Sequence, residues 1–132
     1  MPHEITWAQD KRIILNRLIG TLDLEDGFKA SEATNDYINQ GIAPVHLVVD
    51  MSELKGFPTN ITKVNQMNQY LKNPARGWVV VIGGNTLSSF LVNVLSQVVK
   101  FPVAQRPSLN EALEFLRKND ATLEAVPAVE KQ

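Results

Sequence analysis

The chain has 132 residues, of which 44% are hydrophobic and 20% charged, and a formal net charge of −1. This length suits one domain whose core needs no covalent staple. The absence of cysteine excludes disulfides, thiol catalysis and thiolate metal sites. The first residues contain neither a basic stretch nor an apolar one, which predicts no secretory signal and a cytoplasmic location. No arginine-rich run with interleaved aromatic residues indicates nucleic-acid binding.

Charge is unevenly distributed along the chain. Acidic residues outnumber basic ones up to Glu53, whereas residues 54–110 contain no acid. The bases of this second stretch are Lys55, Lys63, Lys72, Arg76, Lys100 and Arg106. Two interpretations stay open: a solvated face, or a weakly positive flank that meets an acidic partner or an anionic group.

The first half of the chain reads as two strands, a helix, a strand and a second helix. Residues 5–8 and 13–22 predict a hairpin with a polar turn. Asp23 stands where a helix can start, and Gly41 is its expected C-cap. An apolar run predicts a third, central strand over residues 45–51, followed by a loop over 52–60. The next helix, from residue 61, must stop before Pro74.

Residues 77–99 form a stretch without a charged side chain. Its glycines, amides and hydroxyls exclude a membrane span. Residues 78–82 instead form an unbroken apolar run, typical of a strand that is buried on both faces of a parallel sheet. Gly83 and Gly84 interrupt the run, and an apolar stripe at helical spacing follows from Leu87 to Val99.

The last elements are a short strand over residues 101–105 and a helix. Ser108 and Glu111 have the spacing of a capping box at the start of this helix. The complete order is ββαβαβαβα, which predicts an α/β fold with a sheet of four or five strands and four helices. We expect a single domain over residues 1–120 and a frayed tail over 121–132.

Three segments resemble the STAS domain family, which includes bacterial anti-sigma factor antagonists and the domain appended to sulfate transporters. Residues 18–23, Leu-Ile-Gly-Thr-Leu-Asp, match the family's Gly-x-Leu-Asp pattern at the end of its second strand. Residues 48–54, Val-Val-Asp-Met-Ser-Glu-Leu, match the third strand and its Asp-x-Ser exit. Residues 106–113, Arg-Pro-Ser-Leu-Asn-Glu-Ala-Leu, match the start of the final helix. The element order agrees over residues 5–119, and the chain is most similar to small stand-alone sporulation anti-sigma factor antagonist-like proteins.

The resemblance implies a mixed, mostly parallel sheet backed by helices, no catalysis, and a protein partner. In the antagonists, a kinase phosphorylates a serine in an Asp-Ser-Ser-Gly loop after the third strand. Here Phe57-Pro58-Thr59-Asn60-Ile61 stands in that place, so the aspartate and the glycine are replaced. Thr59 keeps a hydroxyl, and two roles for it stay open: a phosphoacceptor or a helix cap.

Few residues point to catalysis or to a metal. His46 lies in a buried strand and is interpreted as an imidazole satisfied by backbone rather than a general base. The acids of residues 23–26 complement a helix dipole rather than bind a metal. Residues 83–86 read as a turn, with an anion-binding loop as the alternative. We predict no catalytic residue, no cofactor and no metal.

The polar sides of two predicted helices carry neutral side chains instead of the usual lysines and glutamates. Neutral side chains lose water more cheaply, so such a face suits burial by another chain or a ligand. An ordinary exposed face is the alternative. The predicted partner-contact residues are Gly56, Phe57, Pro58, Asn60, Ser88, Ser89, Val92, Asn93 and Ser96.

The sequence therefore predicts a non-enzymatic regulatory or protein-interaction module of the STAS type, without the usual Asp-Ser phosphorylation motif. Its partner is another protein or a second copy of the chain. The alternative is a carrier of a small apolar ligand or a lipid, held in an apolar crevice near the carboxyl ends of the strands. We expect neither nucleic-acid binding nor a transmembrane segment.

Overall fold

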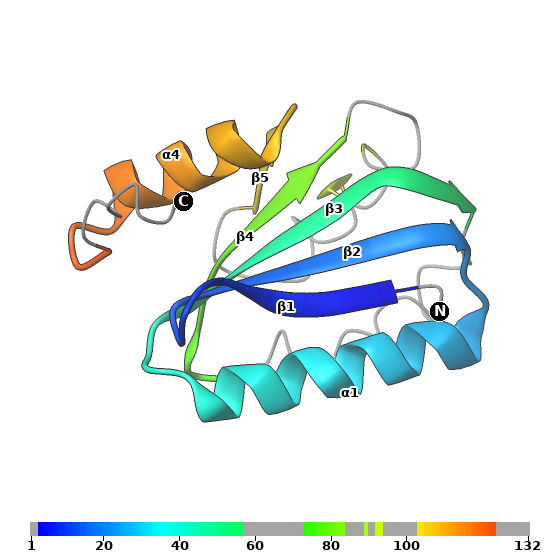
Figure 1. The fold of residues 1–132 in the computed structure, drawn as a ribbon, viewed down its shortest axis with the longest axis horizontal. Helices are drawn as coiled ribbons and strands as arrows, with labels where there is room; N and C mark the ends of the chain where they lie inside the picture. Colours follow the sequence, from blue (N-terminus) through cyan, green and yellow to red (C-terminus); the bar gives the residue numbers. More distant parts are fainter. Residues whose placement is uncertain (1–2, 57–72, 84–88, 90–91, 94–102, 124–132) are drawn as a thin grey trace.

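One five-stranded sheet organises the molecule (Figure 1). The computed structural model describes residues 3–56, 73–83, 89, 92–93 and 103–123. The strands are β1 (His3–Gln9), β2 (Ile13–Thr21), β3 (Val45–Gly56), β4 (Arg76–Ile82) and β5 (Val103–Arg106). They lie side by side in chain order; β1 is antiparallel to β2, and every other neighbouring pair is parallel. The mixed, mostly parallel sheet is confirmed.

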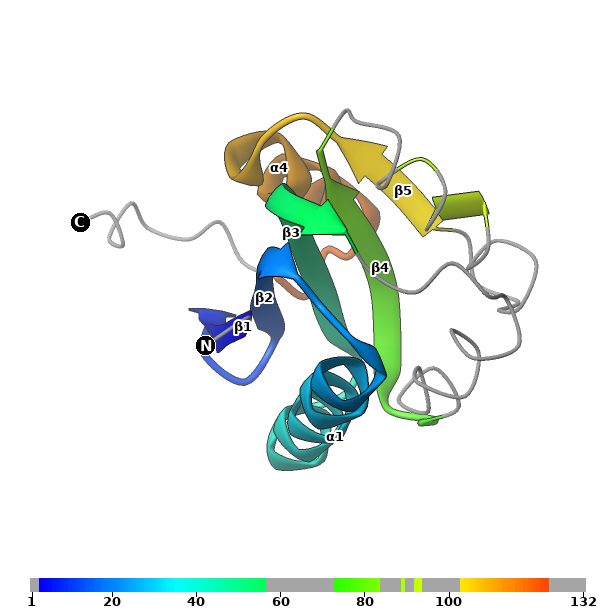
Figure 2. The same cartoon turned by 90° about the vertical axis from the view of Figure 1, so that its right-hand side faces the viewer.

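Two helices are complete among the described residues, α1 (Leu24–Gln40) and α4 (Leu109–Asn119). They cover opposite faces of the sheet (Figure 2). Of the other two predicted helices, the one from residue 61 lies almost wholly outside the described residues. The one over 87–99 is represented only by residues 89, 92 and 93, which are helical.

Both complete helices begin at the caps that the sequence indicates. The Asp26 backbone N–H donates to the Asp23 carboxylate at 2.8 Å, and the Asp23 N–H donates to the Asp26 carboxylate at 3.1 Å. This reciprocal pair satisfies donors that a helix start leaves open. The Glu111 N–H donates to the Ser108 hydroxyl at 3.2 Å in the same way. At the other end of α1, Gly41 is the C-cap as predicted.

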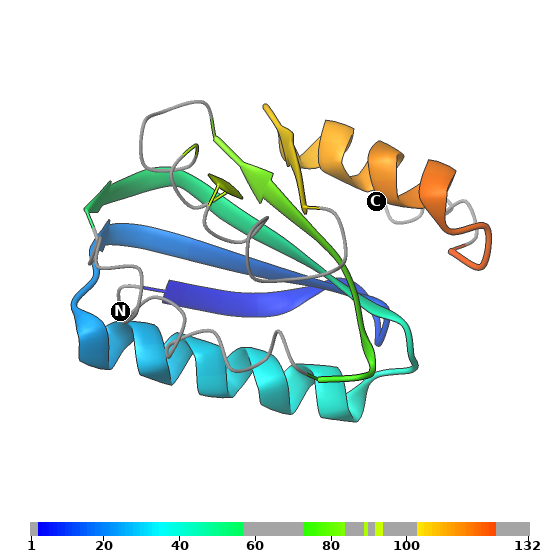
Figure 3. The same ribbon diagram turned by 180° about the vertical axis from the view of Figure 1, so that it is seen from behind.

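The core has one layer on each face of the sheet. On the α1 side it contains Leu47, Val49, Val79 and Val81; on the α4 side it contains Val48, Val80, Ile82, Ala112 and Leu116. Successive residues of β3 and β4 thus point into different layers, which explains their unbroken apolar runs. β3 occupies the middle of the sheet, and β4 lies between β3 and the short edge strand β5 (Figure 3).

β3 is longer than the sequence suggests. Its expected end was residue 51, with a loop from Ser52, but the strand continues to Gly56. A bulge separates the two parts, because Arg17 pairs with Asp50 whereas Ile19 pairs with Glu53. After the bulge Leu54 is buried in the α1-side layer, so residues 53–56 remain in the sheet. The period-two pattern is broken at the bulge, and this hides the extension from a sequence reading.

The chain stays packed for a few residues beyond α4. Leu123, which the sequence places in the tail, is only 2% exposed and packs in the α4-side layer. The predicted frayed tail otherwise lies outside the described residues, over 124–132, and stays a prediction. In the part of the chain that the structure describes, no helix is both long and apolar enough to span a membrane.

Candidate functional site

One of the predicted contact residues, Gly56, lies at the edge where the parallel strands end. This carboxyl edge is formed by the ends of β2, β3, β4 and β5. The Leu22 N–H donates to the Gly56 carbonyl at 2.8 Å. The Gly83 N–H donates to the Arg106 carbonyl at 3.3 Å, and the Gln105 side chain donates to the Gly83 carbonyl at 2.7 Å. Backbone ends of neighbouring strands are therefore joined to one another along this edge.

Four predicted contact residues are described. Gly56 ends β3 and is half-buried, and Ser89 and Asn93 are exposed. Ser89 and Asn93 stand four residues apart in a helical segment, so they share one face. Val92 is half-buried and packs against the α1-side core. Phe57, Pro58, Thr59, Asn60, Ser88 and Ser96 lie outside the described residues.

The Asp-x-Ser pattern, which lies at the bulge of β3 and not at its end, has a local structural role. One oxygen of the Asp50 carboxylate accepts hydrogen bonds from the Ser52 backbone N–H at 2.9 Å and from the Ser52 hydroxyl at 2.7 Å. These bonds hold the backbone at the bulge of β3. Arg17 lies beside this turn, with its Nε 3.8 Å from the other Asp50 oxygen and its Nη2 2.6 Å from Glu53.

A second polar cluster lies at the opposite end of the sheet, where β3 and β4 begin. We call Arg12, His46, Asp120 and Thr122 the His46 cluster. One Asp120 oxygen accepts from His46 Nε2 at 2.8 Å and from Arg12 Nη2 at 3.1 Å. The other accepts from the Thr122 backbone N–H at 2.9 Å and from the Thr122 hydroxyl. Arg12 also donates to the Pro44 and Thr122 carbonyls, each at 3.3 Å.

The hydrogen bonds of His46 fix its protonation state. The Trp78 backbone N–H donates to Nδ1 at 2.9 Å, so Nδ1 carries no proton. Nε2 therefore carries the proton and donates it to Asp120. Gly77 lies against the ring so closely that a Cβ at this position would overlap His46. The imidazole is 2% exposed and both its nitrogens are used, which confirms the interpretation of His46 as a residue satisfied in part by backbone.

The cluster shifts the pKa values of its two titratable partners downward. Burial lowers the pKa of His46 and outweighs the opposing effect of the Asp120 carboxylate. Burial alone would raise the pKa of Asp120, but hydrogen bonds from the Thr122 hydroxyl, His46 and the Thr122 backbone lower it to about 2. At neutral pH an ionised Asp120 carboxylate thus lies between a neutral imidazole and the Arg12 guanidinium.

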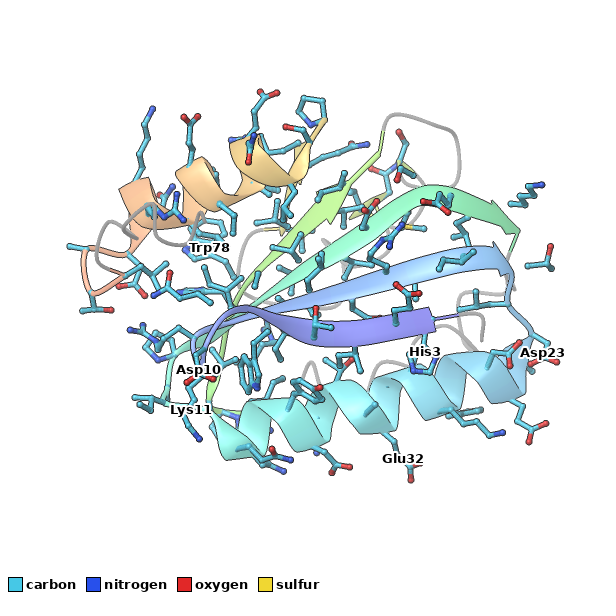
Figure 4. All side chains as sticks on the ribbon, in the orientation of Figure 1. His3, Asp10, Lys11, Asp23, Glu32 and Trp78 are labelled. Atoms are coloured by element: carbon cyan, nitrogen blue, oxygen red, sulfur yellow. The ribbon has the colours of Figure 1, made fainter. Side chains whose placement is uncertain are left out.

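Two hollows open on the described surface. One, with a volume of about 340 Å³, lies beside the His46 cluster, and its described walls include Pro44, Pro74, Arg76 and Trp78. Trp78 stands edge-on to Phe115 of α4 at 4.9 Å between ring centres, near the end where Asp10 and Lys11 form the hairpin turn (Figure 4). The larger hollow, about 720 Å³, lies along α1, and its described walls are Glu25, Phe28, Lys29, Ser31, Glu32, Asn35 and Asp36.

The acids at the start of α1 act as the sequence predicts. Asp23 and Asp26 form the capping box, and Glu25 lies 3.5 Å from Lys29 one turn further on. Among the described residues, no three histidine or acidic side chains are grouped so that they could hold a metal ion.

Sequence reasoning missed the role of Asp120, which it placed at the end of the domain. One signal was available: Asp120-Ala121-Thr122 repeats the Asp-x-hydroxyl spacing of Asp50-Met51-Ser52. That spacing predicts an Asx turn in both places. It does not reveal that the second turn lies against a histidine 74 positions earlier in the chain.

Comparison with known proteins finds similarity at the level of structure. No protein-family model and no curated protein matches the sequence. An uncharacterized protein of the DUF3478 family from Shewanella loihica, described as having a SpoIIAA-like fold, superimposes with a TM-score of 0.63 at 17% identity over 86% of this chain and 91% of its own. The anti-sigma factor antagonist SpoIIAA in its unphosphorylated form gives a TM-score of 0.60 at 15% identity, over 87% of this chain and 97% of its own.

The Bacillus cell fate determinant SpoIIAA in its phosphorylated form gives a TM-score of 0.58 at 13% identity over 87% of this chain and 99% of its own. The three structures cover nearly the same share of the chain, 86% to 87%. They agree with the fold that the STAS resemblance implies. The chain has a SpoIIAA-like fold.

Proposed function

We propose that the chain is a non-enzymatic regulatory module of the STAS type, which binds a protein partner through its carboxyl edge in the cytoplasm. The observation that carries the proposal is the likeness of its fold to SpoIIAA, an anti-sigma factor antagonist, over 87% of the chain. An antagonist of this kind acts by binding rather than by chemistry. We propose the same mode of action, binding to a protein partner, for this chain, and we leave the identity of the partner open.

The described surface supports a partner contact at Ser89 and Asn93. Ser89 and Asn93 are exposed, uncharged and on one helical face, so a partner can cover them without stripping water from a full charge. At the other edge both nitrogens of His46 already have partners. A general base must have a nitrogen free to reach its substrate. His46 is therefore committed to structure.

Affinity capture from the source cell tests the proposal. The bait is compared with a variant that carries Ser89→Glu and Asn93→Lys, which leaves the net charge unchanged. The matched control carries Glu114→Lys and Lys118→Glu on α4, two exposed residues whose exchange also leaves the net charge unchanged. We expect the wild type and the control to capture the same defined protein and the first variant to lose it. Equal capture by all three contradicts a contact at residues 89–93.

The proposal also includes regulation without the usual Asp-Ser motif. Pro58 and Ile61 stand in place of the aspartate and glycine of the motif, and only the Thr59 hydroxyl remains. If Thr59 is a helix cap, Thr59→Ala should lower the free energy of unfolding by about 1 kcal/mol and leave partner capture unchanged. As a phosphoacceptor, it predicts that Thr59→Glu alters capture. Intact-mass measurement of protein from its own cell decides: an added phosphate on Thr59 overturns the cap interpretation.

A further inference from the structure

The smaller hollow lies where three segments of the chain meet. Its described walls come from around the start of β3, the start of β4 and the end of α4. Its volume of about 340 Å³ is at the lower end of the range of small-molecule sites and equals that of about ten water molecules. The hollow therefore has the size for a small organic molecule.

Asp120 is the one acid among the walls that the structure describes, and its hydrogen bonds are used within the protein. One carboxylate oxygen accepts from His46 and Arg12, and the other accepts twice from Thr122. A carboxylate has about four positions at which it can accept a hydrogen bond. Arg12 Nη2, 3.1 Å away, also balances its charge. This arrangement does not favour a cation in the hollow.

Arg76 places a positive charge at a buried part of the hollow. The residue is 5% exposed, and its Nη1 donates to a backbone carbonyl of β4 at 2.8 Å. His46, the other basic wall, is neutral, as its hydrogen bonds require. Among the charged groups at the hollow, two guanidinium groups, those of Arg12 and Arg76, thus accompany the one carboxylate of Asp120. An anion of single charge would complement them.

Rigid apolar groups form other parts of the hollow. Trp78 is half-buried, and its ring stands edge-on to Phe115 with 4.9 Å between ring centres. The backbone N–H of Trp78 donates to His46, which fixes the start of β4. Pro44 and Pro74 are exposed walls, and a proline ring has little conformational freedom to lose. Walls that are fixed before binding reduce the entropy lost when a ligand enters.

We propose that this hollow binds a small organic monocarboxylate, with the apolar body of the ligand against Trp78 and its carboxylate at Arg76. A guanidinium is planar and can donate two parallel hydrogen bonds to a carboxylate, which makes arginine well suited to this group. A phosphate dianion would bring one negative charge too many for the groups at the hollow. The inference goes beyond the proposed function and is independent of it, because the hollow shares no residue with the predicted partner contact.

Titration of the full chain with benzoate tests the proposal. Benzoate has one negative charge and one ring, and benzamide is an uncharged molecule of nearly the same shape. NMR signals of the wild type are followed at about pH 7, where a carboxylic acid of this kind is ionised. We expect millimolar benzoate to shift the signals of residues 76–78, 119 and 120 and of the Arg76 Nε–H in a saturable way. Benzamide should bind about tenfold more weakly, because it lacks the charged acceptor.

A charge at the mouth of the hollow sharpens the test. Pro74→Glu and Pro74→Gln change the same exposed wall and differ from each other in charge. Benzoate should bind the glutamate variant about threefold more weakly than the glutamine variant, and benzamide should bind both equally. Pro107→Glu, at an exposed position outside the hollow, should bind benzoate as the wild type does.

Four results would overturn the proposal. They are the absence of shifts with millimolar benzoate, shifts confined to other parts of the chain, equal binding of benzoate and benzamide, and equal binding of benzoate by the two Pro74 variants. The first two concern the site, and the last two concern the charge of its ligand.

Discussion

Two turns of the same local pattern lie in different surroundings in this protein. Asp50 and Ser52 form a turn at the bulge of β3, where Ser52 is exposed. Asp120 and Thr122 form the same kind of turn, but there the carboxylate also accepts from the buried His46. The local pattern decides that a turn forms; the neighbours decide how much of the fold depends on it. The following predictions compare substitutions in the buried surroundings of His46 with substitutions at more exposed places.

The largest effect is expected in the layer beneath the His46 cluster. Val80 of β4 is fully buried in the α4-side layer, together with Leu116 and Leu123. Val80→Asp places a carboxylate there without a partner, at a cost of several kcal/mol, which is comparable to the stability of a whole domain. We expect the variant to be unfolded by circular dichroism. A cooperative thermal transition would show that this layer is not essential.

Two glycines compare the two ends of the sheet directly. Gly77→Ala forces a Cβ into the His46 ring and should cost about 2 kcal/mol, as overpacked cores do. Gly56→Ala at the carboxyl edge meets only Thr21, at 3.7 Å, which is ordinary contact. Its effect should stay within about 0.5 kcal/mol. Urea unfolding of both variants gives the comparison, and equal costs would contradict the close packing around His46.

Acid should weaken the fold in two steps. The folded pKa of His46 is lowered, so the neutral form stabilises the fold above about pH 6.5, and this stability is lost as the pH falls from there toward the native pKa. The pKa of Asp120 is lowered to about 2, so its contribution is lost between about pH 4 and pH 2. Urea midpoints measured across this range should fall in both steps. In His46→Gln the first step should disappear, and its persistence would assign that step to another group.

The smallest effect on stability is expected at the exposed helical face of Ser89 and Asn93. Ser89→Glu with Asn93→Lys changes exposed side chains, and the free energy of unfolding should stay within about 0.5 kcal/mol of the wild type. If the neutral face of residues 89–93 forms a homodimer, the same variant should sediment as a monomer. A wild type that is monomeric at high concentration rules out the homodimer and leaves another protein or a ligand as the partner.

Much of the fold can be read from residues that are close in the chain. The unbroken run of residues 78–82 predicts a strand covered on both faces, and Asp23 and Ser108 predict the starts of α1 and α4. These features depend on neighbours within a few positions, which a sequence displays. The hairpin and the five strands follow from the same kind of signal.

The rest depends on contacts between distant residues. The extension of β3 to Gly56 needs a bulge and a pairing with β2, which the pattern after Asp50 does not show. The meeting of His46 with Asp120 needs α4 to return to the amino edge of the sheet. His46 could be interpreted as a structural histidine from its apolar strand, but its partner could not be named. Ser89 and Asn93 of the predicted contact surface are exposed, and the contact itself stays a prediction.

Our central claim is that the residues around an Asx turn determine how much the turn contributes to the free energy of unfolding. Replacing each of the two aspartates separately tests this claim most directly. Asp120→Ala leaves the buried His46 Nε2–H without its acceptor and removes the charge partner of Arg12, which keeps its bonds to Pro44 and Thr122, and it should lower the free energy of unfolding by about 3 kcal/mol. Asp50→Ala removes the bonds of a turn that Ser52 leaves open to solvent, and it should cost about 1 kcal/mol or less. Urea unfolding of the two variants at neutral pH measures the difference. A cost for Asp120→Ala clearly larger than that for Asp50→Ala supports the account, and equal costs would contradict it.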